Sequence, residues 1–63
     1  MILGNPDVFE VGDPVVDQYA VDRRVGIIIS IEEGEDGGRV LVVEEDGHPG
    51  NVWRIPDANA VLP

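Results

Sequence analysis

Residues 25–31 read VGIIISI, and this stretch decides the fold. Most of its positions hold β-branched residues, which favour strands because their stiff side chains pack well on a pleated surface. Its nearly unbroken apolar character predicts burial on both faces, or one face covered by a partner. The run is far shorter than the roughly 20 apolar residues that a membrane-spanning helix needs. We therefore expect a soluble chain that does not bind membranes.

Two further apolar runs follow this strand, each set off by turn residues. RVLVVE at 39–44 and NVWRI at 51–55 come after the glycine-rich segments EEGEDGG and DGHPG. Turn signals spaced about eight to twelve residues apart are typical of a small sandwich or barrel. We expect 25–31, 39–44 and 51–55 to form consecutive antiparallel strands. A helical turn at 56–59 and a short strand at 61–62 should follow.

A Gly-Asp-Pro break at 12–14 separates the alternating run VFEV from VVDQYAV, which we expect to be a strand running into a loop. Glycine reaches backbone angles that other residues avoid. Asp13 can bond its own turn, and Pro14 suits a strand start because it lacks an amide donor. We interpret the break as the corner at which the chain enters its first strand.

The order of these features resembles the five-stranded SH3-like small barrel. VGDPVV, RRVGIIISI and RVLVV are similar to KOW-type and chromatin-type barrels, which often begin GD-x-V and carry G-x-(I/V)-x-x-I on the second strand. The matching residues are Gly12, Asp13, Val15, Gly26, Ile28 and Ile31. The segment EEDGHPGNVWRIPDANAVL also looks like the tail of small actinobacterial barrels of unknown function.

The resemblance implies an all-β fold, a five-stranded SH3-like small barrel over residues 9–63. The residues themselves predict one short 3-10 turn near the C-terminus, beginning at Pro56, and an N-terminal arm at 1–8, an apolar tip followed by turn residues. Nucleic-acid-binding relatives are usually basic on their loops, whereas the hairpin loops here, EEGEDGG and EEDGHPG, are acidic. This departure argues against an RNA-binding or ribosomal role.

The charge balance points the same way. Thirteen acidic residues against four basic ones give a net charge of −9, and the basic residues are all arginines. A field of that sign repels phosphate backbones, so we expect no binding to nucleic acid. The chain has no cysteine, which excludes disulfides and thiolate metal sites.

No residue pattern predicts catalysis or a cofactor. The acidic loop residues lack the EF-hand spacing, so solvated hairpin tips are expected rather than a metal site; they are Glu32, Glu33, Glu35, Asp36, Glu44, Glu45 and Asp46. His48 lies in a turn, and Ser30, the single serine, lies within an apolar strand. We expect no enzyme activity, no metal, no cofactor and no small-molecule substrate.

Contacts with other protein chains are the remaining expectation. The apolar tip Met1, Ile2 and Leu3 precedes a Gly-Asn-Pro turn, and an exposed apolar tip gains by burial against a neighbour. Trp53 is expected to be partly exposed, whereas Phe9 should pack in the core. Arg23 and Arg24 either remain solvated or pair with acidic loops, of the same chain or of a neighbouring copy. The expected partner-binding residues are Met1, Ile2, Leu3, Trp53, Arg23 and Arg24.

We therefore expect a non-enzymatic accessory or structural subunit of a homo- or hetero-assembly. Compact accessory proteins are common in viral shells and tails, so the specific expectation is a phage or archaeal-virus virion component. Two alternatives stay open, an acidic binding module or nucleic-acid mimic that regulates a cellular partner, and a KOW-type nucleic-acid binder. The start of the chain lacks a basic region followed by a long apolar one, so we expect a virion or cytoplasmic location without a signal peptide.

Overall fold

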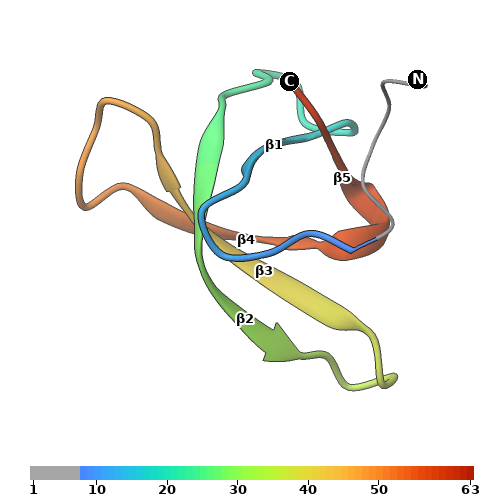
Figure 1. Cartoon of the computed structure of the whole chain (residues 1–63). Coiled ribbons are helices and arrows are strands. Elements are labelled where there is room, and N and C mark those ends of the chain that lie inside the picture. The colour runs from blue at the N-terminus through green and yellow to red at the C-terminus, as the bar shows by residue number, and fades with distance from the viewer. Residues whose placement is uncertain (1–7) are drawn as a thin grey trace, which may run out of the picture.

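Five antiparallel strands make up the fold in a computed structural model that describes residues 8–63. In chain order the elements are β1 (Pro14–Asp17), β2 (Gly26–Glu33), β3 (Arg39–Glu45), β4 (Val52–Pro56), the 3-10 turn η1 (Asp57–Asn59) and β5 (Ala60–Val61). The sheet order is β4-β3-β2-β1-β5, so β4 and β5 are its two ends (Figure 1). The all-β fold with one short 3-10 turn is confirmed. The sheet is not closed, and a barrel is therefore not confirmed.

The three consecutive strands β2, β3 and β4 pair as expected, within one or two residues of the predicted bounds. The first strand, β1, ends at Asp17 and runs into a loop, as expected. There the Oδ1 atom of Asp17 accepts a hydrogen bond from the amide of Tyr19 at 2.9 Å, which turns the chain. Residues 8–11 form no strand, and Phe9 is buried while Val11 is exposed.

The corner at 12–14 is confirmed. Gly12 has a φ of 98°, in the left-handed region that favours glycine. The Oδ2 atom of Asp13 accepts from the amide of Glu10 at 2.9 Å, and Pro14 opens β1. The amide of Gly12 and the carbonyl of Asp13 bond the backbone of Ile28, at 2.8 and 3.0 Å. The corner is thereby joined to β2.

A bulge in β2 decides which side chains face the core. Ile28 pairs with Val43 and Ser30 with Val42, so Ile29 is an extra residue without a partner on β3. A bulge bends the strand that carries it, and β2 follows a long curve in Figure 1. Ile29 is 45% exposed, so burial of the run on both faces is not what the structure has. Cover by a partner stays a prediction.

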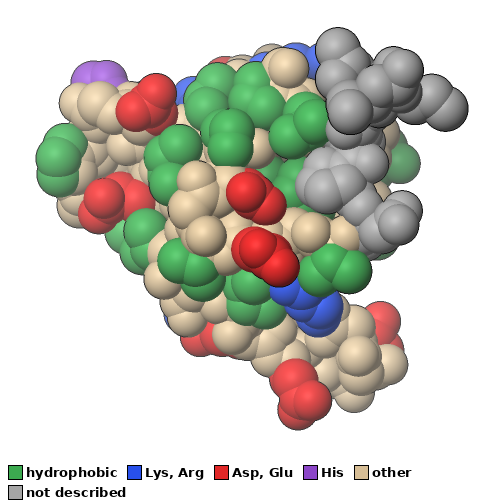
Figure 2. Space-filling model, in the orientation of Figure 1, with side chains coloured by type: hydrophobic (Ala, Val, Ile, Leu, Met, Phe, Trp, Pro, Cys, Tyr) green, Lys and Arg blue, Asp and Glu red, His purple; other side chains and the backbone are tan. Residues whose placement is uncertain are grey.

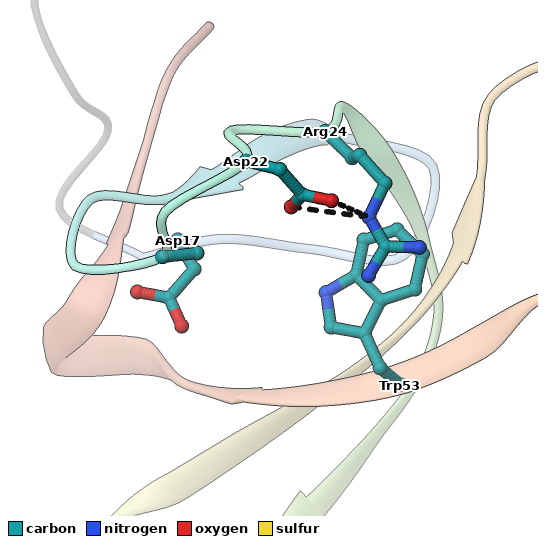
Figure 3. Close-up of a pocket in the computed structure, with 5 residues that line it drawn as sticks. Asp17, Asp22, Arg24 and Trp53 are labelled. Atoms are coloured by element: carbon teal, nitrogen blue, oxygen red, sulfur yellow. Dashed lines mark hydrogen bonds and ion pairs between the residues drawn. The ribbon is translucent and has the colours of Figure 1, made fainter.

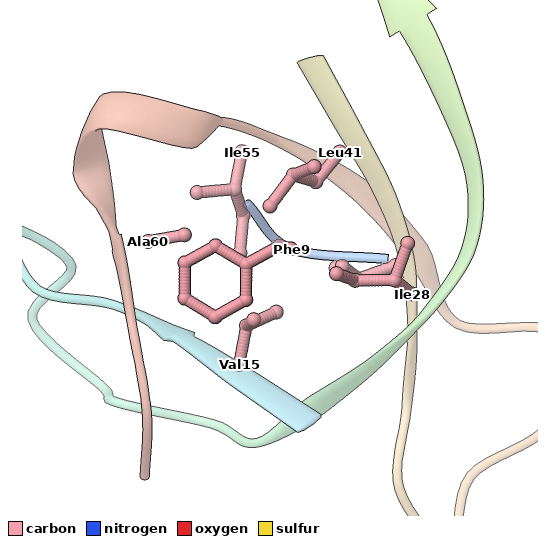
Figure 4. Packing of buried hydrophobic residues seen from close by; sticks show 7 residues of the cluster. Phe9, Val15, Ile28, Leu41, Ile55 and Ala60 are labelled. Atoms are coloured by element: carbon pink, nitrogen blue, oxygen red, sulfur yellow. The ribbon is translucent and has the colours of Figure 1, made fainter. Parts of the chain in front are cut away.

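The core lies on the concave side of this curved sheet. Its buried side chains come from all five strands and from the segment before β1; they are Phe9, Val15, Ile28, Leu41, Val43, Ile55 and Ala60 (Figure 4). Ile31 and Trp53 pack against its margin. Within residues 8–63 no polar or charged side chain is buried. Apolar burial, with Phe9 in the core as expected, therefore holds the interior together.

Strands β2, β3 and β4 have a second side, which faces away from the core. We call it the outward face; it is made of the residues that alternate with the core positions. Register places Ile27, Glu44 and Val52 in one row and Ser30, Val42 and Arg54 in the next. Glu32, Val40 and Pro56 form a third row, and Ile29 lies beside these rows at the bulge. Among the described strands, the exposed large apolar side chains are Ile29 and Val52.

Gly26 marks the tightest approach between strands. A Cβ atom at this position would lie 2.9 Å from Cβ of Val43 and 3.1 Å from Cζ2 of Trp53. Both neighbours are held by the core, so neither can move freely away. Glycine is needed here because there is no space for a side chain.

We predict that Gly26→Ala lowers the free energy of unfolding by about 1–3 kcal/mol, the usual cost of overpacking a core. Urea denaturation followed by circular dichroism measures it. Gly34→Ala is the matched control, because the nearest atom to a new Cβ there is a carboxylate oxygen of the exposed Asp36, at 3.3 Å. It should change stability by less than about 0.5 kcal/mol. Equal losses in the two variants would contradict the packing argument.

Candidate functional site

Trp53 is the structural centre of the candidate partner site. It lies on β4, half-buried, and its ring packs against Gly26 and the core margin. Together with Asp17, Ala20, Asp22 and Arg24 it lines a small hollow of about 70 Å³ (Figure 3). The ring therefore joins the core to the loop between β1 and β2.

Arg24 covers the ring, with its guanidinium carbon 4.5 Å from the ring centroid. A cation over an aromatic face is attracted by the negative charge density of that face. The Nε atom of Arg24 lies 3.2 Å from a carboxylate oxygen of Asp22, and Nη1 lies 3.3 Å from Oε1 of Glu45. The structure thus unites two of the expected partner residues, Trp53 and Arg24, in an intramolecular contact.

Glu45 ties this cluster to the turn between β3 and β4. Besides Arg24, its carboxylate accepts from Nδ2 of Asn51 at 2.5 Å and lies 3.6 Å from Nε2 of His48. The side chain is only 18% exposed, which strengthens its polar contacts. One carboxylate therefore joins the β1–β2 loop to the β3–β4 turn. Glu45 was expected to be a solvated loop residue, and this role was not predicted from the sequence.

Arg23 has different neighbours from Arg24, although the two are adjacent in the chain. Its Nη2 atom donates to the carbonyl of Gln18 at 3.3 Å. It lines another hollow together with Val16, Val25, Val61, Leu62 and Pro63. The remaining expected partner residues, Met1, Ile2 and Leu3, lie outside the described residues.

A further ion pair, on the outward face, was not expected from the sequence. Nε of Arg54 lies 2.9 Å from Oε1 of Glu32, and Nη2 lies 3.4 Å from Oε2. The hydrogen bonds from Arg54, followed by its charge, hold the pKa of Glu32 below its usual range. The pair spans β3, where Val42 lies opposite Arg54 in register and is only 7% exposed.

The described residues bring together no constellation with an evident reaction. Within 8–63, no group of three or more His, Cys, Asp or Glu side chains converges as metal ligands would. His48 lies in the turn after β3, whereas Ser30 is exposed on β2. Nor does this part of the chain contain a helix long and apolar enough to cross a membrane. What the site offers chemically is a clamped aromatic ring and charged side chains.

We predict that Arg24→Gln lowers the free energy of unfolding by about 1 kcal/mol, because it removes the cation from Trp53 and the ion pairs with Asp22 and Glu45. The matched control is Arg23→Gln, which loses one exposed hydrogen bond and should cost less than about 0.5 kcal/mol. Urea unfolding followed by Trp53 fluorescence measures both. Equal losses of stability in the two variants would refute the stabilising role of Arg24 at Trp53.

The Glu32–Arg54 pair generates a pH dependence. Because the folded-state pKa of Glu32 is depressed, its contribution is present above the unfolded pKa and is lost as pH falls through the folded one. We expect the melting temperature of Glu32→Gln to lie slightly below that of the wild type near neutral pH and to converge with it in acid. Glu35→Gln, whose carboxylate forms no ion pair with any described residue, should show no such convergence. A Glu32→Gln difference that is independent of pH would contradict the assignment.

No protein-family model, curated protein or solved structure matches this chain. The resemblance to SH3-like small barrels therefore stays a prediction, and the named contacts of residues 8–63 are the ground for a function.

Proposed function

We propose that this chain is a non-enzymatic subunit that joins a larger assembly through contacts with other protein chains. The observation that carries the proposal is the apolar content of the outward face. Ile29 and Val52 are 45% and 43% exposed there, on two strands of one sheet. Apolar surface that a sheet leaves exposed can be covered by a partner protein.

The charges of the outward face support the same proposal. Glu32 and Arg54 neutralise one another, and Glu44 accepts a hydrogen bond from the amide of Gly50 at 3.1 Å. The amide does not cancel a charge, so Glu44 stays negative, and it is a small part of the net charge of −9. On the side seen in Figure 2, carboxylates lie among the apolar side chains and around the hairpins. A partner that approaches the outward face meets less repulsion than one that approaches the loops.

The acidic surface favours a second candidate, an acidic binding module for a basic partner. Several carboxylates form no ion pair with any described residue, among them Glu33, Glu35, Asp46 and Asp57. Such a module binds through charge and loses its partner as salt rises, whereas an apolar contact is much less sensitive. The virion component expected from the sequence is one form of the first proposal and stays a prediction.

The two candidates are separated by recovering the full-length tagged chain from its natural host at about 0.15 M and about 1 M salt. We expect protein partners in fixed stoichiometry at both concentrations. A partner lost at high salt would favour the acidic module. Recovery of nucleic acid alone, or of the chain alone at both concentrations, would contradict both.

The N-terminal tip gives a further prediction. Each large apolar side chain of Met1, Ile2 and Leu3 can contribute about 1.5–3 kcal/mol when buried against a neighbour, before ordering costs. Deleting residues 1–5 should weaken assembly and leave the melting temperature of the isolated chain unchanged. Size-exclusion chromatography and thermal unfolding of the truncated chain measure the two effects. The opposite pattern, a lower melting temperature with intact assembly, would show that the tip serves the chain's own fold.

A further inference from the structure

Among residues 8–63, β4 ends the sheet, and its backbone has a strand neighbour on one side only. The amide of Glu45 donates to the carbonyl of Asn51 at 2.9 Å, so Asn51 bonds toward β3. Backbone groups of an antiparallel strand alternate in direction, so Trp53 and Ile55 also bond toward β3. Those of Val52, Arg54 and Pro56 then point to the open side. Pro56, which has no amide hydrogen, occupies one of these outward positions, in agreement with the pattern.

This edge is guarded less than edges usually are. Natural sheets protect an open edge with charged side chains, prolines or bulges. The charged side chain of Arg54 is drawn away across β3, with its Nε atom 2.9 Å from Oε1 of Glu32. Pro56 removes one donor at one end of the strand. The amides of Val52 and Arg54 remain available to an added strand, beside the exposed side chain of Val52.

The charges around the edge decide what kind of segment fits it. Glu44 lies opposite Val52 on β3, and Asp57 follows Pro56, so a carboxylate lies near each end of β4. Each arginine already bonds within the chain. The pairs are Arg23 with Gln18, Arg24 with Asp22 and Glu45, Arg39 with Phe9, and Arg54 with Glu32. A second copy would bring nine further excess negative charges and no unbonded arginine. A partner must therefore supply its own cations.

We propose that the open edge of β4 docks an extended segment of a partner protein, apolar in its middle and basic at both ends, which adds to the sheet as a further strand. The backbone of the segment bonds Val52 and Arg54, its apolar side chains cover Val52, and its cations reach Glu44 and Asp57. Strand addition of this kind takes affinity from the backbone and specificity from the side chains. The inference rests on the proposed function and names the partner's chemistry.

The test uses the full chain and a short peptide, Lys-Val-Thr-Val-Thr-Val-Lys, with amide hydrogen exchange followed by nuclear magnetic resonance. In the free protein the amides of Val52 and Arg54 should exchange fast. Near-saturating peptide should slow them by about tenfold or more, the mark of a formed hydrogen bond. The amides of Trp53 and Ile55, already bonded to β3, should change little. If the exchange rates of the Val52 and Arg54 amides stay unchanged at millimolar peptide, the proposal is overturned.

Matched variants test the side-chain part. Val52→Ser should weaken peptide binding by about tenfold, because it removes the apolar contact at the edge. Val21→Ser changes a fully exposed valine in the β1–β2 loop and should leave binding unchanged. Thermal unfolding verifies that both variants fold. If Val52→Ser and Val21→Ser affect peptide binding equally, the proposal that β4 is the docking edge is overturned.

Two further outcomes also count against the proposal. Equal binding of the peptide with both lysines replaced by glutamate removes the charge argument. Protection of the β4 edge that grows with protein concentration, without peptide, shows a second copy as the occupant. In either case partners recovered from the host would still uphold the proposed function, so the two failures are distinguishable.

Discussion

The close approach of β2 to β3 and β4 at Gly26 is the constraint on which the rest of the structure depends. With no side chain at this position, Val43 and the Trp53 ring lie directly against the backbone of β2. Gly26 also pairs with Val15 on one side and with Glu45 on the other. The start of β2 therefore sets the position of β1, of the ring and of the carboxylate that binds Arg24. A side chain here would disturb the core and the candidate site together.

The bulge at Ile29 divides the work of β2 between two surfaces. Before it, Gly26 and Ile28 face the core, and after it Ile31 packs against the core margin. The extra residue itself leaves an apolar side chain 45% exposed. A bulge bends and twists its strand, so the same local irregularity that lets the sheet curve around Phe9 also leaves Ile29 partly in solvent.

Much of the fold could be predicted, because β-branched runs and glycine-rich turns act locally. Strands β2, β3 and β4 and the Gly-Asp-Pro corner were predicted in this way. The bulge was not, since nothing in VGIIISI shows which residue lacks a partner. The end of β1 is a local feature as well, because Asp17 bonds its own turn.

The site was less accessible to such reasoning because its contacts join distant segments. Arg23 and Arg24 are alike in the sequence, and only the fold shows that Arg24 covers Trp53. The Glu32–Arg54 pair likewise depends on the register of two strands with β3 between them. Met1, Ile2 and Leu3 lie outside the described residues, so the expectation for the tip stays a prediction.

The arginines of this chain connect its distant segments and also determine how its charges are balanced. Arg24, Arg39 and Arg54 each join segments far apart in sequence, and so they act as internal ties. This use leaves the carboxylates in excess, and a net charge of −9 on a small domain opposes its compact state. A partner that brings cations to Glu44 and Asp57 relieves part of that repulsion. Because such a partner binds only the folded sheet edge, mass action then stabilises the fold itself.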